Sequence, residues 1–146
     1  MRRLRLLLAV MLVAGVVLVP ATATANVHEC ATVEGHGFLD FGTAGEGRLR
    51  LMVDGQRQVV TFFPTGAIET GENMLDIRFV MMFDEGPLVV VEHSVGTPIG
   101  DGIILFESDL DIKKGGSGGL YWYGIADQNA GFADIHHVTG EICFDR

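Results

Sequence analysis

The stretch Gly115-Gly116-Ser117-Gly118-Gly119 matches the G-x-S-x-G pattern that surrounds the nucleophile of many serine hydrolases. In those enzymes the serine stands at a sharp turn between a strand and a helix. Here the run Leu120-Tyr121-Trp122-Tyr123 follows, which is aromatic and typical of a strand. We therefore interpret the glycines as turn positions that accept positive φ, and we predict no catalytic role for Ser117 or any other residue.

Histidines and carboxylates are the next residues that could do chemistry, as ligands of a metal ion. His136 and His137 are adjacent, so on a strand they point to opposite faces and cannot bind one ion together. Asp134 and His136 share a face, and Glu92 or His93 from another strand could complete a nitrogen and oxygen site. Nothing in the sequence brings these strands together, so we interpret the histidines as surface residues. We predict neither a metal nor a cofactor.

Two cysteines, Cys30 and Cys143, lie near the two ends of the chain. In an oxidising compartment, an even number of cysteines indicates a disulfide. A zinc site would need further cysteines or closely spaced histidines, and the sequence has no further cysteine. We expect a Cys30–Cys143 disulfide that closes a loop of more than 110 residues.

The N-terminus has the features of a secretory signal peptide. Three arginines occur within the first five residues, the 14 residues from Leu6 to Val19 carry no charge, and Ala23-Thr24-Ala25 forms a small-residue cleavage site. A spanning helix needs about 20 apolar residues, which is longer than this run. We predict that residues 1–25 are a signal peptide, with a cut after Ala23 as the alternative. Residues 26–146 then form one exported domain, either secreted or periplasmic.

The predicted exported chain is strongly acidic. The whole sequence has 10 basic and 19 acidic residues, and removal of the three N-terminal arginines leaves seven basic residues and a formal charge of −12. This charge repels nucleic acid and anionic membrane surfaces, so we expect neither as a partner. Composition does not indicate an oligomeric state.

Alternating apolar and polar residues predict strands along the whole chain. Residues 48–53 alternate, Asp54-Gly55 favours a tight hairpin, and residues 57–63 return as its partner strand. We expect this second strand to end at Pro64-Thr65-Gly66, because proline and glycine interrupt strands. The first strand, between Val27 and Phe41, is irregular in sequence.

The next strand, residues 73–83, places five apolar side chains on one face. The opposite face carries Asp76 and Arg78, which we expect to point outward. Further strands are predicted at 88–95 and 103–112, separated by a turn at 97–102.

The last two strands are predicted at 120–126 and 132–144, after a turn at 113–119. About eight strands with short connections favour antiparallel pairing of neighbours. Closure into an all-β, up-and-down barrel removes both exposed edges and brings the two cysteine-bearing strands together. A two-sheet β-sandwich is the alternative, because a disulfide could also join its terminal strands.

The aromatic strand offers candidates for residues that line a cavity. By alternation, Tyr121 and Tyr123 share one face, while Trp122 and Gly124 share the other. One of the two sets should fill or line the barrel interior, so we take Tyr121, Trp122 and Tyr123 as candidates. Gly124 should mark a bulge or a barrel corner.

The segment Gly115-Gly116-Ser117-Gly118, followed by aromatic and small residues, resembles the glycine-rich turn between late strands of dirigent and allene-oxide-cyclase-like barrels. The likeness covers about a dozen residues, and Tyr123 stands where those families have a small residue. The resemblance implies an eight-stranded barrel with a central cavity. It carries over no catalytic residue.

Three functions are compatible with this sequence. The first is an exported binding protein that holds a small apolar ligand inside the barrel, since an eight-stranded barrel is just wide enough for one. The second is a structural or interaction protein whose barrel is filled by side chains. The third is a cyclase or isomerase that acts through the shape of its cavity, and the absence of a clustered acid–base pair disfavours it.

Overall fold

The computed structural model describes residues 29–42 and 45–145, which form an all-β structure of eight antiparallel strands. The predicted signal segment lies outside the described residues. The strands are β1 (Cys30–Asp40), β2 (Glu46–Val53), β3 (Gln56–Gly71), β4 (Met74–Phe83), β5 (Gly86–Gly100), β6 (Ile103–Lys114), β7 (Gly116–Asp127) and β8 (Phe132–Phe144).

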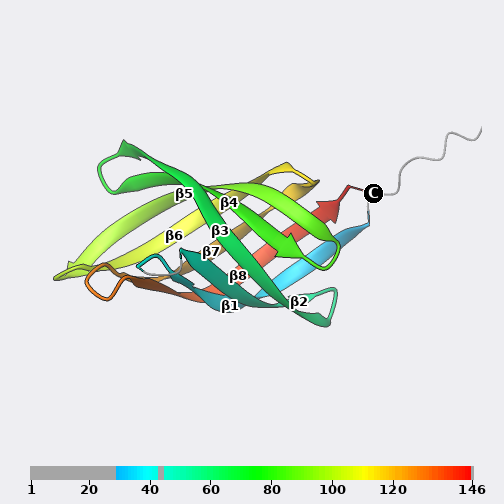
Figure 1. Ribbon diagram of the computed structural model, residues 1–146, viewed down its shortest axis with the longest axis horizontal. Helices are drawn as coiled ribbons and strands as arrows, with labels where there is room; N and C mark the ends of the chain where they lie inside the picture. The colour runs from blue at the N-terminus through cyan, green and yellow to red at the C-terminus, as the bar shows by residue number, and fades with distance from the viewer. Residues whose placement is uncertain (1–28, 43–44, 146) are drawn as a thin grey trace, which may run out of the picture.

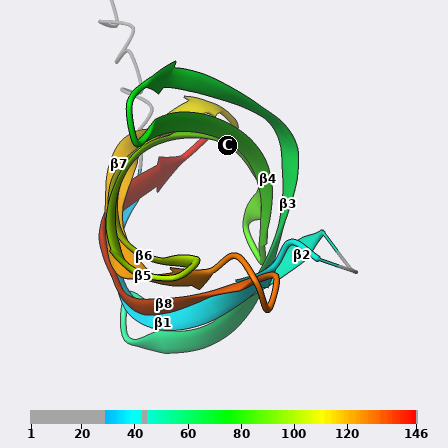
Figure 2. The same cartoon turned by 90° about the vertical axis from the view of Figure 1, so that its left-hand side faces the viewer.

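Each strand pairs with its neighbours in sequence, and β1 pairs with β8 to close the barrel. Viewed end-on, the strands form a ring (Figure 2). This arrangement confirms the predicted up-and-down barrel and excludes the two-sheet sandwich. Cys30 lies directly opposite Cys143 in the β1–β8 register, and the two form the predicted disulfide.

The Asp54-Gly55 hairpin has the predicted geometry, with φ of 48° and 77° at its two central residues. Both values lie in the left-handed region that a tight two-residue hairpin requires. At Gly124, the pairing of β7 with β8 shifts register, as expected of a bulge. A Cβ at this glycine would lie 2.0 Å from the Asp134 carbonyl oxygen, so the close backbone approach also requires glycine.

Two predicted strand ends were wrong, because β3 continues past Pro64 to Gly71 and β5 continues past Pro98 to Gly100. Beyond Phe62, β3 pairs only with β4, and beyond Val95, β5 pairs only with β6. A proline lacks an N–H but is tolerated where one side of the strand has no partner. Register shifts next to both prolines absorb the remaining mismatch.

The predicted turn at 113–119 is also shorter than expected. Only Gly115 separates β6 from β7, and it has a φ of 87°. The residues after it, from Gly116, are already paired with the end of β8. The glycine-rich segment is therefore mostly strand, and no helix follows it in the part of the chain that the structure describes.

The alternation of residues sets the inner and outer faces as expected for β4, whose apolar side chains point into the barrel while Asp76 and Arg78 point outward. The half of the barrel near the disulfide is packed with buried apolar side chains. The largest of these include Leu49, Leu51, Val60, Phe62, Met81, Leu88, Val90, Leu110 and Ile142. The opposite end, on the left in Figure 1, carries the β3–β4, β5–β6 and β7–β8 hairpin tips.

Candidate functional site

A cavity of about 620 Å³ lies inside the barrel at the end opposite the disulfide. Residues from the late part of β1, the β3–β4 tip and the early part of β6 surround its mouth. Its wall is mainly apolar and includes Leu39, Ile77, Ile104, Phe106, Ala126 and Ile135. Ligand sites in proteins have volumes of roughly 300–1,000 Å³ and largely apolar walls, so this cavity has the size and character of one.

Three aromatic rings separate the cavity from the packed half of the barrel. Phe79 and Trp122 line the cavity, and Phe62 is buried behind them. The ring centroids of Phe62 lie 5.2 Å from Phe79 and 5.5 Å from Trp122, with tilted and edge-on geometries that aromatic pairs prefer. These rings form a rigid floor, because each is almost fully buried.

Glu92 on β5 is buried and lines the cavity beside this floor. Its Oε1 accepts a hydrogen bond from the Ser108 hydroxyl at 2.5 Å and one from the Trp122 indole N–H at 2.8 Å. Burial raises the pKa of Glu92, and the hydrogen bonds from Ser108, Trp122 and Ser94 oppose that rise only in part. A carboxyl group thus stands oriented by three donors inside an apolar cavity.

The other charged side chains that line the cavity are also acidic. Glu69 and Glu72 lie at its mouth, near the β3–β4 tip, and both are exposed. None of the described residues that line the cavity is a lysine, an arginine or a histidine. The cavity therefore combines apolar walls, one buried carboxyl group and an acidic mouth.

Of the three aromatic candidates from the sequence, Trp122 lines the cavity but Tyr121 and Tyr123 do not. Tyr123 is 44% exposed on the outer face, and Tyr121 reaches Glu107 on that same face. Alternation within β7 explains this correction, because a strand that turns Trp122 inward must turn both tyrosines outward. Sequence reasoning left open which of the two sets pointed inward.

The residues considered as metal ligands are not brought together. His93 lies on the outer face, where its Nδ1 is 2.8 Å from Asp76, whereas Glu92 points into the barrel. Asp134 and His136 are near each other on β8, with 3.5 Å between their closest ligand atoms. Since β5 and β8 are not neighbours in the barrel, these two pairs are separate surface features.

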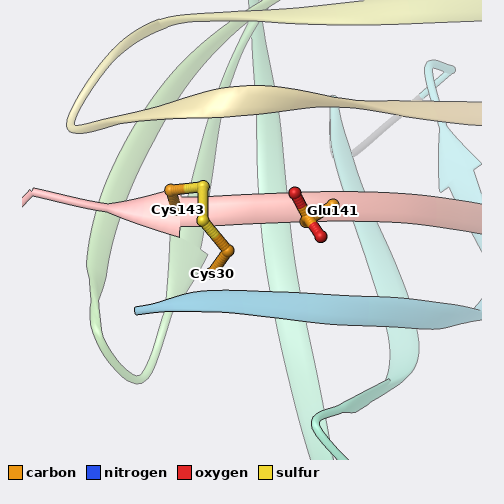
Figure 3. A group of neighbouring side chains, drawn as sticks. All are labelled: Cys30, Glu141 and Cys143. Carbon is orange, nitrogen blue, oxygen red and sulfur yellow. A yellow bond between two sulfur atoms is a disulfide. The ribbon is translucent and has the colours of Figure 1, made fainter. Parts of the chain in front are cut away.

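The one cluster with metal-ligand spacing among the described residues consists of Cys30, Cys143 and Glu141. Figure 3 shows the two sulfur atoms bonded to each other, with the Glu141 carboxylate further along β8. Because both cysteines are consumed in the disulfide, they offer no thiolate to a metal. This cluster is structural and fixes the β1–β8 seam at the closed end of the barrel.

Sequence reasoning missed Glu92 as a cavity residue. The signal was present in the phase of β5, since Leu88, Val90, Glu92 and Ser94 alternate onto one face. The two apolar members of that set mark the face as inward. Reading Glu92 in that phase would have placed a carboxyl group inside the barrel.

No family model matches this chain, and no similar curated protein or solved structure was found. The resemblance of the Gly115–Gly118 segment to dirigent and allene-oxide-cyclase-like barrels therefore stays a prediction. In the part of the chain that the structure describes, no helix is long and apolar enough to cross a membrane. The disulfide is consistent with an oxidising environment.

Proposed function

We propose that this protein is an exported carrier or receptor that binds one small, mainly apolar ligand in the open end of its barrel. The observation that carries the proposal is the cavity of about 620 Å³ with apolar walls. A barrel whose only task is structural gains stability by filling such a space, because each void forfeits packing contacts. Here the packed half of the barrel supplies stability, and the other half stays open.

The division of the barrel into two halves supports this function. The disulfide and the aromatic floor of Phe62, Phe79 and Trp122 hold the wall strands at one end. A site on a rigid scaffold loses little conformational entropy when a ligand enters, so binding energy is retained. Export to a compartment outside the cytoplasm is part of the proposal. It rests on the N-terminal sequence and agrees with the disulfide.

Binding of N-phenyl-1-naphthylamine, a neutral apolar probe whose fluorescence rises in apolar surroundings, tests this function. Trp122 is the only tryptophan of the chain and lines the cavity, so its emission should fall as the probe binds. We expect saturable binding of about one probe per barrel. Probe fluorescence that stays at its value in buffer, with unchanged Trp122 emission, would contradict the proposal.

Two neighbouring substitutions on β3 locate the bound probe. Ala67 lines the mouth of the cavity, whereas Ile68 is 70% exposed and does not line it. Ala67→Phe should obstruct the mouth and weaken binding at least about tenfold, whereas Ile68→Phe should leave it nearly unchanged. Equal effects of the two variants would place the probe elsewhere on the surface.

A further inference from the structure

Glu92 has hydrogen-bond donors on the protein side but no cationic side chain among the described residues that line the cavity. Its charged neighbours on the adjoining strands are all on the outer face of the barrel. Those nearest to it are Asp76 and Arg78 on β4, His93 on β5, and Glu107, Asp109 and Asp111 on β6. The charge of His93 acts on Glu92 from the outer face, so a positive charge in direct contact with an ionised Glu92 would have to enter the cavity with a ligand.

The mouth of the cavity also favours a positively charged ligand. Glu69 and Glu72 create a negative potential where a ligand enters, and the chain as a whole has a formal charge of −9. Such a field attracts cations and repels fatty acids and other anions. The apolar walls, including Ile77, Ile104 and Phe106, would contact the rest of the ligand.

We propose that the ligand is a lipophilic amine, which places its ammonium group against Glu92 and its apolar body along the walls toward the mouth. This inference rests on the proposed binding function and specifies its ligand. Ser108 and Trp122 hold Oε1 in a fixed orientation, so the carboxylate is positioned before the ligand arrives. An ammonium group then gains a charge-assisted hydrogen bond in a cavity whose walls are largely apolar.

Three ligands with the same ten-carbon chain separate the possible headgroups: decylammonium, 1-decanol and decanoate. Each ligand is added to the protein with N-phenyl-1-naphthylamine bound. The fall in probe fluorescence as the ligand displaces the probe measures the affinity of that ligand. We expect decylammonium to bind at least about tenfold more tightly than decanol, and decanoate to bind most weakly. If decanol or decanoate binds as tightly as decylammonium, the amine inference is wrong while the binding function stands. If neither the probe nor any of the three ligands binds, the proposed function itself fails.

Glu92→Gln removes the charge with little change of shape, and Asp109→Asn removes one acidic charge from the outer face of β6. The Gln variant should lose the preference for decylammonium over decanol while still binding the neutral probe. The Asn variant should keep the preference. A preference retained in Glu92→Gln would overturn the inference.

The pH dependence of the wild-type protein gives a second, independent readout if Glu92→Gln does not fold. Burial raises the pKa of Glu92, and an ammonium group needs the ionised carboxylate. An alkylammonium, like a lysine side chain, stays charged up to a pH of about 10. Decylammonium affinity should therefore rise with pH as Glu92 ionises, while decanol affinity stays flat. An ammonium affinity that falls or stays constant as the pH rises above the ordinary carboxyl value of 4.5 would reject the inference.

Discussion

Trp122 donates its indole N–H to Glu92 across 2.8 Å, and this bond joins β7 to β5 through the interior of the barrel. The two strands are not neighbours in the sheet, since β6 lies between them. The same indole ring packs against Phe62 and Phe79 in the cavity floor. One side chain therefore both closes the packed half of the barrel and orients the polar group of the open half.

Truncation of Trp122 should destabilise the protein strongly. Trp122→Ala removes a buried indole and should lower the free energy of unfolding by about 3–5 kcal/mol. Tyr123→Ala is the control on the next residue, which is 44% exposed, and it should cost far less. Urea denaturation followed by circular dichroism measures both. Similar losses in the two variants would contradict the inward orientation of Trp122.

Trp122→Phe isolates the hydrogen bond to Glu92, because it retains most of the apolar contact. The loss of one donor should cost about 0.5–1.5 kcal/mol, the net contribution of a typical hydrogen bond, because Ser108 still donates to the same oxygen. It should also raise the pKa of Glu92 further, since the indole N–H lowers that pKa in the native protein. Nuclear magnetic resonance of the labelled Glu92 side-chain carbon reports the pKa, and a decrease would contradict the assigned bond.

The ionisation of Glu92 should make stability depend on pH. Its folded pKa is raised above the ordinary value of 4.5, so its contribution to stability is fully present below that value. The contribution is lost as the pH rises through the folded pKa. The free energy of unfolding of Glu92→Gln, relative to wild type, should therefore increase with pH from about 4 upward. A constant difference between the two proteins over that range would show that Glu92 is not desolvated.

The fold was largely predictable because its signals are local. Alternation in residues 48–53 and 73–83 requires one buried face, and Asp54-Gly55 specifies a tight hairpin. Eight such strands with short connections leave two edges, and the cysteine positions favour joining them. The two missed extensions at Pro64 and Pro98 have a non-local cause. A proline ends a strand that has partners on both sides, and the sequence does not state where a neighbouring strand stops.

The site was less predictable, because it depends on which face of each strand points inward and on how much of the barrel interior the side chains fill. For β7, both faces carry aromatic residues, so hydrophobicity did not distinguish Trp122 from Tyr121 and Tyr123. For β5, the phase of the alternation would have placed Glu92 inside. The cavity depends on the side chains of all eight strands together, because a void forms only where their summed volume leaves space. No single segment of the sequence therefore predicts it.

The glycine-rich segment should tolerate a change of its serine but not of a glycine. Ser117 is exposed, so Ser117→Ala should change the free energy of unfolding by no more than about 0.5 kcal/mol. Gly118 has a φ of 104°, and an added Cβ would lie 2.3 Å from the Glu141 carbonyl oxygen. Gly118→Ala should therefore cost about 1 kcal/mol or more. Thermal melts compare the two, and a large loss in the serine variant would contradict the prediction that this exposed serine contributes little to stability.

The pKa of His93 should lie above the ordinary histidine value of 6.5. The hydrogen bond that the His93 Nδ1–H donates to the Asp76 carboxylate is the main cause that raises its pKa, and the charge of Asp111 adds to it. Asp76→Asn should lower the pKa of His93 more than Asp111→Asn does, as measured by imidazole resonances. The interaction of protonated His93 with Asp76 stabilises the folded protein below about pH 6.5, and this stabilisation is lost as the pH rises through the folded pKa. It should stay below about 1 kcal/mol, because the pair is exposed. A larger effect from Asp111→Asn would contradict this assignment.

The Cys30–Cys143 disulfide should supply a large part of the stability of the barrel. It links residues 113 positions apart, and the chain-entropy model gives about 4.7 kcal/mol for a loop of roughly that length. Reduction, or the Cys30→Ser/Cys143→Ser variant, should therefore lower the melting temperature strongly. Hydrogen exchange should accelerate first in β1 and β8 near the cysteines, since the disulfide fixes the end of that ladder.

Binding of the neutral probe should persist below the new melting temperature, because the cavity lies at the other end of the barrel. Two free thiols in the native protein would exclude the disulfide, and uniform acceleration in all strands would show that it does not act locally at the seam.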